Sequence, residues 1–176
     1  MNPWHDVSPG DQVPEIVTAV IEIPRGCIVK YELDKVTGMI RVDRVLFSAV
    51  HYPANYGFIP QTYCEDNDPL DILVLGQATV VPLSLMRARP IGLMRMTDHG
   101  QPDDKIIAVH VDDPEVSDIY SLEQLQQHKL RELRRFFEDY KQLEGKEVHV
   151  HDFLDPAEAR AVVRKDLELY NQKIRK

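Results

Sequence analysis

Short stretches of alternating hydrophobic and polar residues cover the first two thirds of the chain, and turn-forming residues separate them. They are rich in Val, Ile and Leu, which favours β-strands. The predicted strands comprise residues 16–23, 28–33, 39–46, 72–75, 85–96 and 105–111. Because side chains alternate along a strand, Lys30 and Glu32 share one face. Several short strands at this spacing predict a closed antiparallel barrel.

After Ser121 the hydrophobic pattern becomes helical. Ser121 and Gln124 form a capping-box pair, which predicts a helix start, and apolar residues then recur at helical spacing as far as Gly145. A short strand is predicted at residues 148–150, and Asp155 precedes a second helix that runs to the C-terminus. The sequence therefore predicts an α+β fold, mainly β, in which helices pack against a small barrel.

The length of 176 residues fits a single domain, residues 1–176. Within it we expect an N-terminal arm at residues 1–14, mostly barrel strands and site loops at residues 15–120, and helices with one short strand at residues 121–176. The arm has no basic region followed by an apolar run, so we expect no signal peptide and a cytoplasmic location.

Charge and cysteine content narrow the range of functions. The formal net charge of −8 at pH 7 argues against nucleic acid as a partner, because general nucleic-acid binding needs a surplus of Lys and Arg. The charge-free runs are too short to span a membrane. The two cysteines, Cys27 and Cys64, are too few for a disulfide framework or a structural zinc site. A small anionic substrate is compatible with this charge if metal ions reverse it locally.

Two acidic patches are the most informative features of the sequence. Asp66, Asp68 and Asp71 lie within six residues, and their mutual repulsion destabilises the fold unless a cation relieves it. A second patch, with Asp98 and Asp103, also occupies a turn between predicted strands. Each patch alone is compatible with a solvated turn. Carboxylates from two separate turns are ligands that Mg²⁺ prefers, so the two patches together indicate a metal site.

Basic and aromatic residues offer possible contacts to a phosphate group. Lys30 and Arg44 lie on paired strands of a predicted hairpin, where they either converge on a ligand or form a surface ion pair with Glu32. Residues of two other segments either pack in the core or face a ligand, and these are Tyr52, Tyr56, Tyr140 and Lys141.

Together these motifs resemble those of a known family. They lie, in order along the chain, at residues 22–24, 30–32, 43–44, 52–57, 66–71, 98, 103–105 and 140–141. The most specific part is the Asp-x-Asp-Pro-x-Asp run at residues 66–71, preceded by Tyr-Pro-x-Asn-Tyr-Gly at residues 52–57. The chain resembles the soluble family I inorganic pyrophosphatases of the short, prokaryotic type over roughly residues 15–155.

This resemblance implies a fold and an activity. The expected fold is a five-stranded, OB-like antiparallel barrel with flanking C-terminal helices. The expected enzyme is an inorganic diphosphatase, a hydrolase that cleaves pyrophosphate to two phosphates by in-line attack of a water or hydroxide bridging metal ions. Several Mg²⁺ ions per site are implied, with Mn²⁺ or Zn²⁺ as substitutes. For short chains the resemblance also implies a homohexamer.

Matched positions also imply roles for individual residues. Asp68 matches the general base. The catalytic set further includes Tyr56, Lys30 and Arg44. The expected metal ligands are Asp66, Asp71, Asp98 and Asp103. The expected substrate contacts are Lys30, Arg44, Tyr56, Lys105, Tyr140 and Lys141. Residues expected to order water around the metal ions are Glu22, Glu32 and Tyr52.

Two other functions are compatible with parts of the pattern. An OB-like oligonucleotide-binding module would use the tyrosine-containing loop and Arg44, but the acidic patches disfavour it. A non-catalytic metal-binding scaffold would use the carboxylates as ligands only, and it leaves Lys30, Arg44 and Lys141 without a purpose.

Overall fold

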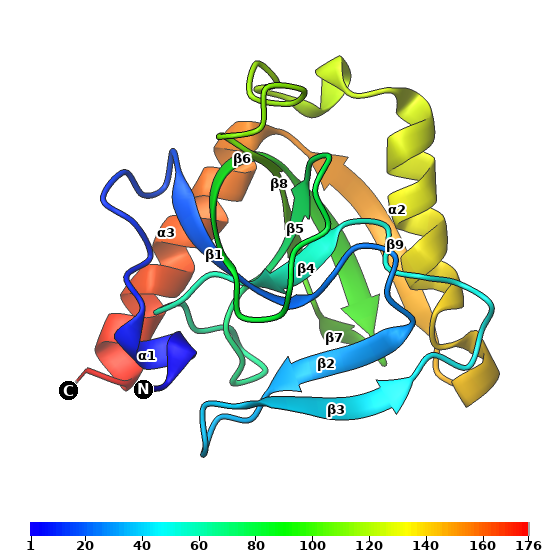
Figure 1. The fold of residues 1–176 in the computed structure, drawn as a ribbon, viewed down its shortest axis with the longest axis horizontal. Coiled ribbons are helices and arrows are strands. Elements are labelled where there is room, and N and C mark those ends of the chain that lie inside the picture. Colours follow the sequence, from blue (N-terminus) through cyan, green and yellow to red (C-terminus); the bar gives the residue numbers. More distant parts are fainter. Residues whose placement is uncertain (176) are drawn as a thin grey trace.

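A ring of five β-strands forms the centre of the computed structural model, which describes residues 1–175 (Figure 1). In their order around the ring the strands are β1 (Val17–Ile23), β4 (Asn55–Phe58), β5 (Asp71–Leu75), β8 (Lys105–His110) and β6 (Leu85–Asp98). Pairing of β6 with β1 closes the ring. Two further strands, β7 (Gln101–Pro102) and β9 (Val148–Leu154), pair with β6. The predicted mainly β fold class is confirmed.

One pairing in the ring differs from the predicted antiparallel arrangement. β5 and β8 are parallel, with Asp71 opposite Lys105 and Leu75 opposite Val109. The long strand β6 follows β5 in the chain and runs in the opposite direction. β8 follows β6 and pairs antiparallel with it, so β8 runs in the same direction as β5. Both parallel strands therefore begin at the same end of the ring, and this end carries charged side chains from each.

The predicted hairpin forms a separate two-stranded sheet outside the ring, made of β2 (Val29–Leu33) and β3 (Ile40–Val45). Lys30 lies opposite Arg44, on the paired strands that the sequence predicts. In Figure 1 this hairpin lies below the ring, with the N-terminal turn α1 (Pro3–Asp6) beside it. The hairpin can therefore add side chains to the end of the ring without taking part in its closure.

Two helices, α2 (Gln127–Asp139) and α3 (Pro156–Lys173), cover different parts of the ring (Figure 1). Phe137 of α2 packs in one hydrophobic cluster, and Val163 of α3 packs in another. Both helices thus bury an apolar stripe against strands. No helix among residues 1–175 is long and apolar enough to cross a membrane.

The predicted helix start at Ser121 is partly wrong. The side-chain oxygen of Gln124 accepts a hydrogen bond from the Ser121 N–H at 3.2 Å, as a capping box requires. Only a single 3₁₀ turn, η1 (Leu122–Gln124), follows it. Leu125 has an extended backbone with φ −78° and ψ 152°, so the chain leaves the helix there and α2 begins at Gln127.

Of the other predicted helix boundaries, the start at Asp155 is confirmed, but the first helix ends at Asp139, before the predicted stop at Gly145. Gly145 ends a second 3₁₀ turn, η2 (Gln142–Glu144), with a φ of 69° that glycine adopts readily. Asp155 caps α3, because its carboxylate accepts a hydrogen bond from the Glu158 N–H at 3.0 Å.

Three elements have no counterpart among the predicted strands and helices, and these are β4, the two-residue strand β7 and α1. β4 contains Gly57, a residue type that is depleted in strands. Glycine is required here because a Cβ atom would lie 1.9 Å from the carbonyl oxygen of Val20. The short turn α1 begins at Asn2, whose side-chain oxygen accepts a hydrogen bond from the Trp4 N–H at 3.0 Å.

Burial of Asp166 in α3 predicts a pH-dependent stability. Burial raises the pKa of Asp166 from 3.8 to about 6, although the Cys64 thiol donates a hydrogen bond to the carboxylate at 3.2 Å. In the unfolded chain the Asp166 carboxyl group ionises at a lower pH than in the folded protein. Its contribution to stability is therefore largest below pH 3.8 and is lost as the pH rises through about 6. We expect Asp166→Asn to raise the free energy of unfolding by about 1–3 kcal/mol at pH 8 and to change it little at pH 4.

Urea unfolding at the two pH values measures this difference. Asp152→Asn, at an exposed position, is the matched control and should change stability at neither pH. An equal effect of Asp166→Asn at pH 4 and pH 8 would contradict the prediction.

Candidate active site

A cavity of about 490 Å³ lies beside the starts of β5 and β8. The ring strands, the β2–β3 hairpin, the acidic loop (residues 66–70) and the chain after α2 share its wall. Twelve predicted site residues line it, namely Glu22, Lys30, Glu32, Tyr56, Asp66, Asp68, Asp71, Asp98, Asp103, Lys105, Tyr140 and Lys141. Arg44 and Tyr52 are predicted site residues outside the lining.

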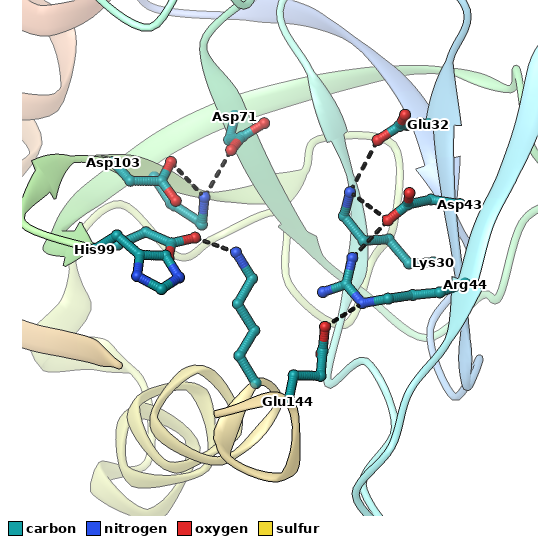
Figure 2. A network of polar contacts seen from close by, with 11 residues as sticks. Lys30, Glu32, Asp43, Arg44, Asp71, His99, Asp103 and Glu144 are labelled. Atoms are coloured by element: carbon teal, nitrogen blue, oxygen red, sulfur yellow. Dashed lines mark hydrogen bonds and ion pairs between the residues drawn. The ribbon is translucent and has the colours of Figure 1, made fainter. Parts of the chain in front are cut away.

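The centre of the site is a buried lysine between two aspartates. The Nζ atom of Lys105 lies 2.6 Å from a carboxylate oxygen of Asp71 and 2.9 Å from one of Asp103. Figure 2 shows the Asp71 carboxylate, from the start of β5, and the Asp103 carboxylate, from the segment before β8, pointing toward the same ammonium group. The rings of Tyr56 and Phe137 lie 5.5 and 5.6 Å from the same nitrogen. Aromatic faces and carboxylates thus enclose one positive charge.

The charges around Lys105 outweigh the effect of its burial. Burial alone would lower the pKa of this amine, but the charges of Asp103 and Asp71 hold its pKa well above the ordinary value. For Asp71 the effect of burial is the larger one. Burial raises the pKa of Asp71, although the charge of Lys105 lowers it. The arrangement comes from the parallel β5–β8 pair, which sets Asp71 directly opposite Lys105.

Glu22 adds a second buried acid at the end of β1. It accepts a hydrogen bond from the backbone N–H of Leu33 at 2.6 Å, which ties the ring to the hairpin. Burial raises the pKa of Glu22 to about 8, against the effect of that hydrogen bond. Its carboxyl group is therefore mostly protonated at neutral pH, and a nearby cation would favour its ionisation.

The hairpin carries a chain of ion pairs along the edge of the cavity (Figure 2). Lys30 contacts Glu32 at 3.0 Å and Asp43 at 3.3 Å. Arg44 contacts Asp43 as well, and its Nε atom lies 2.8 Å from a carboxylate oxygen of Glu144 in η2. These partners direct the Arg44 side chain toward η2, which explains why it does not line the cavity. Its predicted contact with phosphate stays a prediction.

Tyr52 supports the site from behind. It is 1% exposed, and its ring packs 5.5 Å from that of Tyr56 and 4.7 Å from that of Phe136. The ring of this tyrosine thus lies in the core, and the predicted site role of its hydroxyl stays a prediction. At the opposite side of the cavity, Lys141 forms an ion pair with Asp98.

Sequence reasoning missed several residues of the cavity wall, and these include Trp4, Asp34, Lys35 and Arg41. Lys35 forms an ion pair with Asp68, and Arg41 forms one with Glu32. Arg41 lies opposite Glu32, but a bulge after Lys30 sets this register, so the alternation of residues along the hairpin does not indicate it. No local pattern indicates that the N-terminal residue Trp4 reaches the site.

The predicted metal ligands share the cavity but are not arranged as a coordination sphere. Among residues 1–175, no three acidic, histidine or cysteine side chains are positioned to hold one ion. Lysine ammonium groups stand between or beside the carboxylates instead, most clearly Lys105. The donor chemistry fits a hard divalent cation, because eight acidic residues face five basic ones and all the candidate ligands are oxygens.

The combination of side chains in this cavity indicates the class of protein to which the chain belongs. A carboxylate-rich cavity with lysines and tyrosines at its wall is typical of metal-assisted enzymes that act on phosphate groups. The ring of strands provides the rigid frame from which these side chains project.

Comparison with known proteins identifies the family. The family profile described as Inorganic pyrophosphatase matches residues 19–171. Soluble inorganic pyrophosphatase 2 of Chlamydomonas reinhardtii is 57% identical over 97% of this chain and 89% of its own length. Soluble inorganic pyrophosphatase 5 of Arabidopsis thaliana is 56% identical over 98% of this chain and 80% of its own length.

Solved structures agree with the sequence comparison. The crystal structure of inorganic pyrophosphatase from Thermus thermophilus has a TM-score of 0.94 and 39% identity, covering 97% of this chain and 99% of that one. The chain belongs to the inorganic pyrophosphatase family. This confirms the resemblance and the enzyme class expected from the sequence, and the family implies a divalent metal cofactor.

The buried position of Lys105 predicts a large effect of its replacement. Lys105→Met keeps the apolar stem between the two rings but leaves Asp71 and Asp103 without their cation. We expect a loss of about 3–5 kcal/mol in the free energy of unfolding, measured in urea with EDTA. Added Mg²⁺ should restore part of this loss, because it can neutralise the same carboxylates.

Lys129→Met is the matched control, because Lys129 pairs with Glu132 at 2.9 Å on the exposed face of α2. It should cost about 0.5 kcal/mol or less. Similar losses in the two variants would show that the contact of Lys105 with Asp71 and Asp103 contributes little to the free energy of unfolding.

Proposed function

We propose that this protein is a magnesium-dependent inorganic pyrophosphatase that hydrolyses pyrophosphate to two phosphate ions. The observation that carries the proposal is the convergence of twelve predicted site residues on one cavity in a chain of this family. Their combination of carboxylates and cations suits a substrate that is itself a highly charged anion. We also propose that residues 1–176 act as one pyrophosphatase domain.

Four aspartates are proposed as the ligands of Mg²⁺: Asp66, Asp71, Asp98 and Asp103. Glu22, Glu32 and Tyr52 are proposed to order the surrounding water. Bound divalent ions would supply neutralisation of the phosphate oxygens and a more acidic water. With all eight acids ionised, Glu22 included, the lining carries a formal excess of three negative charges, so it repels pyrophosphate until cations bind. Mn²⁺ and Zn²⁺ are proposed as substitutes for Mg²⁺.

Asp68 is proposed as the general base. Its side chain is 49% exposed at the cavity wall, so solvent water can reach it. A carboxylate in this position can take a proton from the attacking water, which lies in line with the leaving phosphate when both are well oriented. The substrate contacts proposed to provide that orientation are Lys30, Arg44, Tyr56, Lys105, Tyr140 and Lys141.

Assembly and location are proposed on the same family basis. We propose a cytoplasmic homo-oligomer, a hexamer in its most specific form. Exposed apolar side chains support self-association, because Val81, Leu83 and Leu85 are 72, 41 and 59% exposed and follow one another closely in the chain.

A phosphate-release assay tests the proposed function. With Mg²⁺ present, we expect rapid release from pyrophosphate and much slower release from ATP and tripolyphosphate. EDTA should abolish turnover, and restored Mg²⁺ should recover it. Turnover that ignores EDTA would contradict metal dependence, and no release from pyrophosphate would refute the proposed activity itself.

Separate variants distinguish metal ligands from the base. Asp71→Asn and Asp103→Asn should weaken Mg²⁺ binding, measured by calorimetry, and lower the rate together. Asp68→Asn should lower kcat by about 10²–10⁴-fold while Mg²⁺ affinity is largely kept, because it removes proton transfer alone. Equal losses of Mg²⁺ affinity in all three variants would refute this division of roles.

A further inference from the structure

Lys35 occupies an unusual position at the cavity wall. Its ammonium group forms an ion pair with Asp68 and lies 3.1 Å from the carbonyl oxygen of Asn67. The same nitrogen lies 5.5 Å above the ring of Trp4, so the side chain is bounded by an aromatic face on one side and the acidic loop on the other. Among residues 1–175, Lys35 is the only ion-pair partner of Asp68.

The turn that carries Lys35 is held by its own hydrogen bonds. One carboxylate oxygen of Asp34 accepts hydrogen bonds from the N–H groups of Val36 and Thr37, at 3.2 and 2.8 Å. These contacts fix the backbone on both sides of Lys35. The direction in which the lysine leaves the turn is therefore set locally.

The N-terminal arm links this turn to the acidic loop. The side-chain amide of Asn2 donates a hydrogen bond to the carbonyl oxygen of Lys35 at 2.8 Å. The Trp4 indole N–H donates to the carbonyl oxygen of Thr62 at 2.8 Å, and Trp4 is only 5% exposed. The hydroxyl of Thr62 accepts a hydrogen bond from the N–H of Leu70 at 2.8 Å. Two nearby residues of the arm, Asn2 and Trp4, thus contact both the turn that carries Lys35 and a segment that flanks the acidic loop.

The contact between Lys35 and Asp68 matters because Asp68 lies, in the sequence, between two other carboxylates, Asp66 of the acidic loop and Asp71 at the start of β5. Asp66 and Asp71 repel it, and its half-exposed side chain gains hydration by turning away from the cavity. A fixed cation opposes that rotation. Since Lys35 is held by the turn and by Trp4, its contact favours the orientation of Asp68 toward the cavity.

We propose that Lys35 is a positioning residue that holds the Asp68 carboxylate toward the reacting water, and that the N-terminal arm keeps Lys35 in place. This inference rests on the proposed function, because it assigns Lys35 a task in the same reaction. It gives the arm a role in activity, through Trp4 and Asn2.

Steady-state kinetics with Mg²⁺ and pyrophosphate test this role. Lys35→Met keeps the aliphatic stem against Trp4 but removes the charge, and we expect kcat to fall about tenfold with KM changed less than twofold. Lys35→Arg should recover most of kcat. Lys173→Met is the matched control, because Lys173 lies 5.1 Å above the ring of Tyr63 but outside the cavity lining, and it should leave kcat unchanged.

A double variant tests whether Lys35 acts through Asp68. Adding Lys35→Met to Asp68→Asn should cause little further loss of kcat, because the residue being positioned has lost its function. Independent, multiplying losses would overturn the proposal. A rise in KM with unchanged kcat would also overturn it, since it would make Lys35 a binding residue.

Two measurements separate this inference from folding and from the proposed function. Trp4 is the only tryptophan in the sequence, so unshifted fluorescence in Lys35→Met shows that the arm remains docked. Crystal structures of the unaltered protein and of Lys35→Met decide the orientation of Asp68 without any assay. We expect the carboxylate to face the cavity only when Lys35 is present. An unchanged orientation would overturn the inference, whereas an inactive but correctly oriented unaltered protein would refute the proposed function alone.

Discussion

The contact of one buried ammonium group with two carboxylates governs the rest of this structure. Lys105 lies between Asp71 and Asp103, and all three positions follow from two strands that begin at the same end of the ring. Placing two acids this close in a buried site is unfavourable without a cation. The protein meets that condition with a lysine of its own, held between aromatic rings.

The pairing of a lysine with acidic side chains recurs around the cavity. Lys141 neutralises Asp98 and Lys35 neutralises Asp68, while Lys30 lies among acids of the hairpin. Each cation comes from a segment distant in the sequence from its partner or from a strand fixed by pairing. The excess of acids that these cations leave accounts for the need for divalent ions in an enzyme of this family. Binding of cations and binding of an anionic substrate are therefore linked through one electrostatic field.

Local patterns predicted what depends on neighbouring residues. Strand periodicity, the pairing of the two hairpin strands and the cap at Asp155 are local properties, and all three are confirmed. The parallel pairing of β5 and β8 depends on the path of the intervening chain, which no period of two reveals. β4 escaped prediction because Gly57 is there for a close approach to Val20, not for strand propensity.

The candidate site was predictable as a set of residues more than as an arrangement. Motif spacing identified the residues around the cavity, but not that Lys105 would be buried between two acids or that Arg44 would turn toward Glu144. Those outcomes depend on tertiary contacts. The contribution of Trp4 depends on where an arm docks, which its own sequence does not determine.

The central claim is that acids gathered around Lys105 form a site for divalent ions. Anomalous diffraction from crystals soaked in Mn²⁺ tests it most directly. We expect strong anomalous peaks inside the cavity, about 2.1 Å from oxygens of Asp71 and of at least one other aspartate, with the Lys105 ammonium displaced to make room. A cavity without anomalous density, in which Lys105 still joins Asp71 to Asp103 at saturating Mn²⁺, would contradict it.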